Sequence, residues 1–138
     1  MVTWLIDTGP LVAFLDRGDP AHAAVNERLS PFRGRLCTTG PVISEAMHFL
    51  PEVTGGPEKL AEFVRSSGLD IVESMASDQL QAAVELMARY CDTPMDFADA
   101  TLVLLADTLG VRDILTLDRR GFRTYRTRKR QNFQLLLG

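Results

Sequence analysis

Short apolar runs that alternate with helical patterns constrain the fold of this chain more than any other feature. Four runs of apolar and β-branched residues are too short for helices and are bounded by polar or turn residues; they cover residues 2–6, 35–38, 69–72 and 114–117. Segments with helical periodicity lie between them, at residues 10–15, 21–29, 41–50, 57–66, 77–90 and 94–109. Continuously apolar strands that alternate with helices are typical of a parallel sheet covered on both faces. We therefore predict an α/β fold, a three-layer α/β/α sandwich around a central parallel sheet.

We expect a single domain that spans residues 1–138. The tail contains two further short apolar segments, at residues 122–125 and 133–136, which we predict as edge strands. With 46% hydrophobic and 24% charged residues, the composition is typical of a globular domain. No apolar run approaches the roughly 18 residues of a membrane span, and no export signal is recognisable, so we expect a cytoplasmic protein without a membrane partner.

Two aspartates follow predicted strands directly. Asp7 comes after the run at residues 2–6, and Asp118 comes after the run at residues 114–117. In an open parallel sheet, ligands bind outside the carboxyl ends of the strands, where loops and helix N-termini converge. If these two strands are parallel, both carboxylates lie at the same edge of the sheet.

Three more acidic residues lie on predicted helices. Asp96 and Asp99 are three residues apart, on one side of the 94–109 helix. Asp99 stands within a mostly apolar helix, where a lone carboxylate is costly unless a cation or hydrogen bonds compensate for its burial. Asp96 has a second explanation, because an acid in the first turn offsets the helix dipole. Glu45 lies about one turn into the 41–50 helix and, taken alone, is better explained as an exposed helical glutamate.

Carboxylates that converge without a basic neighbour indicate a bound metal ion. Such groups repel one another, and a divalent cation removes the conflict. All-oxygen ligation favours Mg²⁺ or Mn²⁺, which also bind substrate phosphates and activate water for phosphodiester hydrolysis. Zinc is not expected, because His22 and His48 lie in separate helices without ligand spacing.

Positive charge is concentrated at the end of the chain, although the net charge is only −3. All 18 acidic residues precede Arg119, and residues 119–138 contain seven of the 15 basic residues. Segregation of this kind favours an anionic partner such as a nucleic acid. We single out Arg119, Arg120 and Arg123 as a positive rim for RNA, with a solvated basic edge strand as the alternative.

Three segments of the sequence together resemble the PIN-domain ribonucleases, and most closely the VapC-like toxins of type II toxin–antitoxin pairs. The segments are "LIDTGPLVAFLD", "ISEAMHFL" and "MDFADATLVLLADTLGVRDILTLDRRGFRTYR", and they span the chain in the order expected of that family. The resemblance implies a PIN-like fold and Mg²⁺- or Mn²⁺-dependent endoribonuclease activity. It also implies a homodimer, and inhibition by a VapB-like antitoxin whose C-terminal segment enters the acidic groove.

The resemblance also assigns roles to single residues. The family's metal ligands are four acids, which correspond here to Asp7, Glu45, Asp99 and Asp118. Asp96 is a fifth acid, typical of the subgroup that reads "MDxADA". Thr8 and Thr116 match positions where family members often have a hydroxyl near the metal. Gly9 stands where many members have serine after "DT", a departure that puts none of the acids in doubt.

Other functions remain open at this point. A housekeeping nuclease of the same fold carries the same acids, and nothing in the residues separates it from a toxin. A non-catalytic PIN module uses the acids only to receive a basic partner. An aspartyl-phosphate phosphatase of the dehalogenase type needs a second aspartate two residues after the first, and Gly9 occupies that place. The complete set of four acids favours the metal-dependent endoribonuclease.

Overall fold

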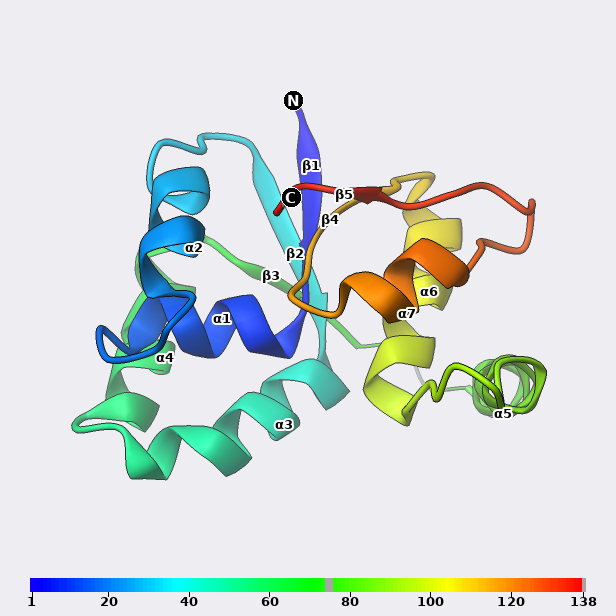
Figure 1. Ribbon diagram of the computed structural model, residues 1–138, viewed down its shortest axis with the longest axis horizontal. Helices are drawn as coiled ribbons and strands as arrows, with labels where there is room; N and C mark the ends of the chain where they lie inside the picture. The colour runs from blue at the N-terminus through cyan, green and yellow to red at the C-terminus, as the bar shows by residue number, and fades with distance from the viewer. Residues whose placement is uncertain (74–75, 138) are drawn as a thin grey trace.

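A parallel sheet forms the centre of the computed structural model, which describes residues 1–73 and 76–137 (Figure 1). Within that part of the chain the sheet has five strands, in the order β3-β2-β1-β4-β5. Their bounds are β1 Thr3–Ile6, β2 Arg35–Thr39, β3 Asp70–Val72, β4 Asp113–Leu115 and β5 Gln134–Leu135. Every pairing between these strands is parallel, so the predicted parallel sheet is confirmed.

Helices cover both faces of the sheet and complete three layers (Figure 1). They are α1 Thr8–Leu15, α2 His22–Leu29, α3 Gly40–Phe49, α4 Gly56–Ser67, α5 Ser77–Arg89, α6 Phe97–Leu109 and α7 Arg119–Thr124, with a 3-10 turn, η1, at Leu50–Glu52. Helices α1, α2 and α4 contribute to the core on one face, and α5, α6 and α7 contribute to the core on the other. The predicted three-layer α/β/α sandwich is therefore confirmed.

Consecutive residues of the central strand point into the two cores. Leu5 packs with Cys37 and Ile114 in the cluster that contains α6, whereas Ile6 packs with Leu115 in the cluster that contains α1. All five side chains are fully buried. Because both faces of the sheet are covered, consecutive residues in the middle of the strands are apolar on both sides instead of alternating with polar residues.

The register of the sheet aligns the ends of β1 and β4. Leu5 pairs with Ile114 and Ile6 pairs with Leu115, and the Asp7 amide then donates to the Leu115 carbonyl over 3.0 Å. The chain adds β2 and β3 on one side of β1 and places β4 on the other, so the strand order reverses between β1 and β4. Open α/β sheets bind their ligands beyond the carboxyl ends of the strands at such a reversal. The end of β1 occupies that position here.

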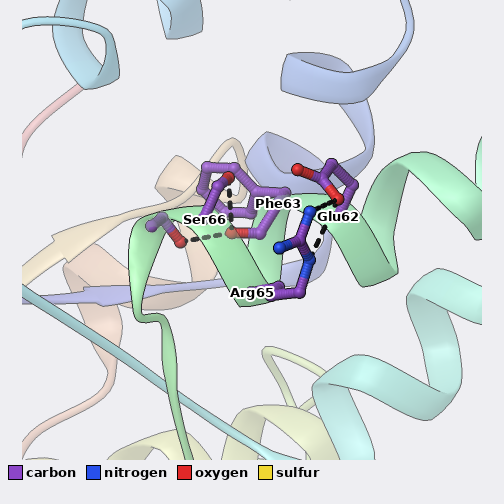
Figure 2. A network of polar contacts seen from close by, with 5 residues as sticks. Glu62, Phe63, Arg65 and Ser66 are labelled. Carbon is purple, nitrogen blue, oxygen red and sulfur yellow. Dashed lines mark hydrogen bonds and ion pairs between the residues drawn. The ribbon is translucent and has the colours of Figure 1, made fainter.

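Contacts within its last turn fix the end of α4. Arg65 forms an ion pair with Glu62 one turn earlier (Figure 2). The hydroxyl of Ser67 donates to the carbonyl of Phe63 over 2.6 Å. Gly68 follows with a φ of 69°, a left-handed conformation that glycine adopts without strain, and the chain turns there toward β3.

The predicted edge strand at residues 122–125 is wrong, because this segment belongs to helix α7 and its C-terminal cap. Asp118 begins the helix by accepting a hydrogen bond of 3.0 Å from the Gly121 amide. Phe122 and Tyr125 are three residues apart and both fully buried in the α6 core, a spacing that puts them on one face of a helix. The basic segment after Asp118 is therefore helical at its start.

Other predicted elements are present with shifted ends. The helix predicted at residues 94–109 begins at Phe97, because Asp96 takes the N-cap position. The edge strand predicted at residues 133–136 is confirmed as β5, which is two residues long. Within residues 1–73 and 76–137, no helix combines the length and the apolar character needed to cross a bilayer.

Candidate active site

Eight acidic side chains line one cavity beyond the carboxyl ends of β1 and β4. The cavity has a volume of about 700 Å³, and its acids are Asp7, Asp16, Asp19, Glu45, Glu52, Asp96, Asp99 and Asp118. No lysine, arginine or histidine of the described residues lines it. The structure thus brings together all five acids predicted for the site, from four separate stretches of the chain.

Asp7 is buried and held by two hydrogen bonds. It forms the N-cap of α1 and is 7% exposed. Its Oδ1 accepts from the Thr8 amide over 2.8 Å, and its Oδ2 accepts from Thr116 Oγ1 over 2.8 Å. Thr116 Oγ1 in turn accepts from the Asp118 amide over 3.0 Å. Thr116 therefore connects the two aspartates that follow β1 and β4.

Asp96 and Asp99 hold each other at the start of α6. Asp96 Oδ1 accepts from the Asp99 amide over 2.8 Å, and Asp99 Oδ2 accepts from the Asp96 amide over 3.1 Å. This reciprocal capping box satisfies two amides that otherwise lack partners. Asp99 is only 9% exposed, whereas Asp96 is exposed. Asp96 was predicted in the first turn of the helix, but it is the N-cap, one position before that turn. Asp96 therefore both begins α6 and lines the cavity.

Burial and mutual repulsion shift the ionisation of the two most buried acids. Burial raises the pKa of Asp7 from 3.8 to about 6, although the hydrogen bonds from Thr116 and Thr8 act in the opposite direction. Burial, and then the charges of Asp7 and Asp96, raise the pKa of Asp99 from 3.8 to about 8. In the protein alone at neutral pH, Asp7 and Asp99 together therefore carry close to one negative charge instead of two.

Glu45 and Asp118 reach the cavity from α3 and from the start of α7. Glu45 is half-buried, and Asp118 is exposed. Within the part of the chain that the structure describes, no three Asp, Glu, His or Cys side chains are grouped so that they could hold a metal ion as they stand. Hydrogen bonds to the protein's own amides and hydroxyls fix Asp7, Asp99 and Asp118 in their present positions.

A buried hydroxyl in the cavity wall lacks a hydrogen-bond partner. Thr8 is 5% exposed and lines the cavity, and its Oγ1 is without a partner among the described residues. A buried hydroxyl left without a partner costs about 1–3 kcal/mol, and such groups often mark the place of an ion or an ordered water. The cavity wall therefore contains an unsatisfied buried hydroxyl next to Asp7.

Comparison with known proteins identifies the family. No family model matches the chain. Among curated proteins, the chain is 32% identical over 123 residues to Ribonuclease VapC26 of Mycobacterium tuberculosis, a match that covers 88% of this chain and 91% of that relative. The chain belongs to the VapC family of PIN-domain ribonucleases. The family predicted from the three sequence segments is thereby confirmed.

Two solved structures share the fold of this VapC-family chain. The crystal structure of VapC20 from Mycobacterium tuberculosis, a toxin that cleaves the sarcin–ricin loop, superposes with a TM-score of 0.71 at 22% identity and covers 84% of this chain and 90% of its own. The structure of PAE2754 from Pyrobaculum aerophilum gives a TM-score of 0.58 at 21% identity and covers 88% of this chain and 84% of its own. At these identities the likeness concerns the fold.

The arginines predicted to bind RNA lie on α7 of this VapC-family chain, outside the cavity lining. Arg119, Arg120 and Arg123 are exposed, and none of them forms an ion pair within the described residues. Arg126 has a structural role instead, since its Nη1 donates to three carbonyls at the end of α7. The three exposed arginines are therefore available to an anionic partner.

The outer acids and the apolar wall of the cavity were not predicted from the sequence. The outer acids come from the turn after α1 and from η1; they are Asp16, Asp19 and Glu52. The apolar side chains are Val12, Phe49, Val53 and Leu117. The signal of the acids was weak, because aspartates in a turn such as "DRGD" are ordinarily explained as solvated turn residues. The apolar wall could not be predicted from the sequence, because apolar residues in helices and strands are ordinarily expected to lie in the core.

Proposed function

We propose that this chain is an endoribonuclease that hydrolyses RNA phosphodiester bonds with Mg²⁺ or Mn²⁺. The metal ligands in this proposal are Asp7, Glu45, Asp99 and Asp118. The observation that supports it best is the convergence of these acids, from distant segments, on one cavity that no basic side chain of the described residues lines. Membership of the VapC family supports RNA as the substrate.

The chemistry of the cavity fits a hard divalent cation. Its lining supplies carboxylate and hydroxyl oxygens, which are the ligands that Mg²⁺ and Mn²⁺ prefer. The Thr8 hydroxyl, which has no partner in the described part of the chain, adds a neutral oxygen next to Asp7. A cation also offsets the repulsion that contributes to the raised pKa of Asp99. When bound, the metal supplies charge neutralisation at the phosphodiester and a water activated for in-line attack.

The chain's own residues hold the proposed ligands in position. Thr116 holds Asp7 by its Oδ2, and because each carboxylate oxygen has two lone pairs, the hydrogen bond leaves acceptor capacity for a ligand. Asp96 holds Asp99 through the capping box. In this proposal Asp96 therefore has two roles: it positions Asp99, and its own carboxylate adds negative charge to the cavity. Partners of this kind orient metal ligands and fix their basicity.

Exposed arginines beside the acids supply the positive charge that the cavity lacks. An acidic cavity repels RNA unless nearby cations neutralise the phosphate backbone. Arg119, Arg120 and Arg123 follow Asp118 directly in the chain and form no ion pair within the described residues. In this proposal they bind backbone phosphates on either side of the phosphodiester that is cut.

We also infer that the chain is the toxin of a toxin–antitoxin pair and acts in the cytoplasm as a homodimer. VapC20 is a toxin that cleaves the sarcin–ricin loop, and the shared fold and the family favour this role. The excess of acids at the cavity favours a basic segment of a VapB-like antitoxin as the inhibitor. Light scattering of the purified protein tests the dimer, because a monomer would contradict this part of the proposal.

The proposed activity is tested by sequencing the RNA ends that the purified protein generates from deproteinised total RNA with Mn²⁺. We expect new ends with the wild type, and none with Asp99→Asn or with EDTA. Glu62→Gln on α4 is the matched control, because it removes a carboxylate outside the cavity and should cleave like the wild type. Cleavage that survives both Asp99→Asn and EDTA would contradict the metal mechanism. No cleavage by the wild type, together with no Mn²⁺ binding in calorimetry, would identify a non-catalytic module.

A further inference from the structure

The acidic cavity has an apolar wall that a metal ion and a phosphate do not require. Four apolar side chains line the cavity together with the acids: Val12, Phe49, Val53 and Leu117. Phe49 and Leu117 are 50% and 42% exposed, so water covers about half of each side chain in the protein alone. Single exposed apolar residues are common, but two that share a cavity with the proposed metal ligands indicate a surface that receives something apolar.

Phe49 lies on the same side of α3 as a proposed metal ligand. Glu45 and Phe49 are four residues apart, which places them one helical turn from each other on one face, and both line the cavity. Several large hydrophobic side chains of the described residues are exposed, and among them Phe49 is the one that is aromatic. The ring of His48 meets it edge-on, at 71° with the centroids 5.5 Å apart. Phe49 thus presents an aromatic ring at the cavity.

Gly9 makes room for Leu117. A Cβ atom on Gly9 would lie 3.2 Å from Leu117 Cδ1, closer than an ordinary van der Waals contact. Gly9 stands in the first turn of α1 without a left-handed backbone, so the conformation itself does not call for glycine, and glycine weakens a helix relative to alanine. Gly9 therefore lies close against the side chain of Leu117, so the start of α1 contacts this exposed leucine at the end of β4.

We propose that Phe49 and Leu117 form a subsite for the nucleobase next to the phosphodiester that is cut. This inference rests on the ribonuclease function proposed above. Unpaired bases of RNA stack on aromatic rings and pack against apolar side chains. In each nucleotide next to the phosphodiester that is cut, one ribose separates the base from the phosphate. The cavity volume of about 700 Å³ is within the range of sites that enclose small organic groups. In this account Phe49 stacks on the base and holds it at the cut, and Leu117 packs against the same base.

The test combines a change in the protein with a change in the RNA. Ends mapped with total RNA and Mn²⁺ define the cut, and an RNA oligonucleotide that contains this cut is then made with an abasic ribose at either flanking position. Cleavage of each oligonucleotide is measured with the wild type, Phe49→Ala and Phe49→Trp. Met47→Ala is the matched control, because Met47 is an exposed apolar residue of the same helix outside the cavity. Thermal unfolding checks that each variant is folded.

We expect the abasic ribose at one flank to lower kcat/KM for the wild type by about 10-fold or more, in line with the usual strength of stacking between a base and an aromatic ring. Phe49→Ala should lower kcat/KM for the intact oligonucleotide by a similar factor and abolish the discrimination against the abasic one, since the two changes remove the same interaction. Phe49→Trp should keep the discrimination, and Met47→Ala should match the wild type.

Two results separate the failure of this inference from the failure of the proposed function. If the wild type cleaves RNA in an Asp99-dependent manner while Phe49→Ala cuts the same sites at the same rate, the subsite is wrong and the nuclease stands. If Phe49→Ala cleaves normally but a protein partner no longer inhibits it, the apolar wall binds a side chain of that partner. This result would overturn the assignment to a nucleobase. If the wild type itself does not cleave, both proposals are wrong.

Discussion

Thr116 donates a hydrogen bond of 2.8 Å to Asp7, although 109 residues separate the two in the chain. The bond exists because β1 and β4 are parallel neighbours whose last residues are in register. The same hydroxyl accepts from the Asp118 amide over 3.0 Å. One side chain thus sets the positions of both aspartates that follow the two central strands.

Replacing Thr116 by valine should weaken metal binding without changing the fold. Valine keeps the volume of the buried side chain but removes the hydroxyl that holds Asp7 and accepts from Asp118. Loss of a hydrogen bond that orients a metal ligand typically costs 10–100-fold in metal affinity or activity. We expect Thr116→Val to lower Mn²⁺ affinity in calorimetry by about that factor, and Thr116→Ser, which keeps the hydroxyl, to restore most of it. Equal affinity of the valine variant and the wild type would contradict this role.

The metal-free protein should lose stability as the pH rises above 4. Asp7 and Asp99 ionise near pH 3.8 in the unfolded chain but near pH 6 and pH 8 in the folded protein, so the folded state binds their protons more tightly. Their contribution is complete below pH 3.8 and is lost as the pH rises through 6 and then through 8. For Asp7 it amounts to about 3 kcal/mol, since one pKa unit corresponds to about 1.4 kcal/mol.

The pH prediction is checked by denaturant unfolding in EDTA from pH 4 to pH 9. Asp99→Asn is the control, because it removes the group that titrates last, and its decline in unfolding free energy between pH 6 and pH 8 should be smaller than that of the wild type. Saturating Mn²⁺ should oppose the decline in the wild type, since a cation bound to the folded state stabilises it. A wild type that becomes more stable than Asp99→Asn as the pH rises would contradict the raised pKa values.

Substituting Gly121 by alanine should displace Asp118 and lower activity. A Cβ atom at this position would overlap the Asp118 carboxylate and would touch the ring of Tyr125. RNA cleavage should fall by at least about 10-fold, and because the buried ring of Tyr125 must also shift, the free energy of unfolding should fall by about 1–3 kcal/mol while the protein remains folded. Gly18→Ala is the comparison, because a Cβ there meets only the Asp16 carboxylate at an ordinary distance of 3.4 Å. Unchanged cleavage by Gly121→Ala would show that the position of Asp118 is not critical.

Removal of the exposed arginines of α7 should weaken RNA binding and its dependence on salt. We expect the triple alanine variant of Arg119, Arg120 and Arg123, made in the inactive Asp99→Asn protein, to raise the Kd for RNA at low salt. The slope of log Kd against log salt should fall by about one for each phosphate that an arginine no longer neutralises. A control with the same change in net charge replaces three exposed basic residues of α4 and α5, namely Lys59, Arg65 and Arg89. If both triple variants bind alike, the arginines of α7 contribute only general charge.

The parallel sheet and the shared edge of its aspartates could be predicted from the sequence for one physical reason. Strands buried on both faces are apolar throughout, and that pattern is visible without any knowledge of tertiary contacts. Once β1 and β4 are parallel, Asp7 and Asp118 must leave the sheet at the same edge, and the structure places both at one cavity.

The start of α7 could not be predicted in this way, because tertiary contacts decide it. In six helical residues and their C-cap, Phe122 and Tyr125 give too few apolar positions to separate a strand period from a helix period. The helix depends on the Asp118 cap and on the burial of both rings in the α6 core. The apolar wall of the cavity was missed for a similar reason, since Phe49 reads as a core residue of α3 until its exposure is known.

The most direct test of the shared metal site is a crystal structure of the protein with Mn²⁺, in which the anomalous scattering of the ion shows where it binds. We predict a peak in the cavity, with carboxylate oxygens of the four proposed ligands, Asp7, Glu45, Asp99 and Asp118, at about 2.0–2.3 Å from it, and no such peak in crystals of Asp99→Asn. A wild-type crystal in saturating Mn²⁺ that shows no anomalous peak in this cavity, or shows one only elsewhere on the molecule, would contradict the account.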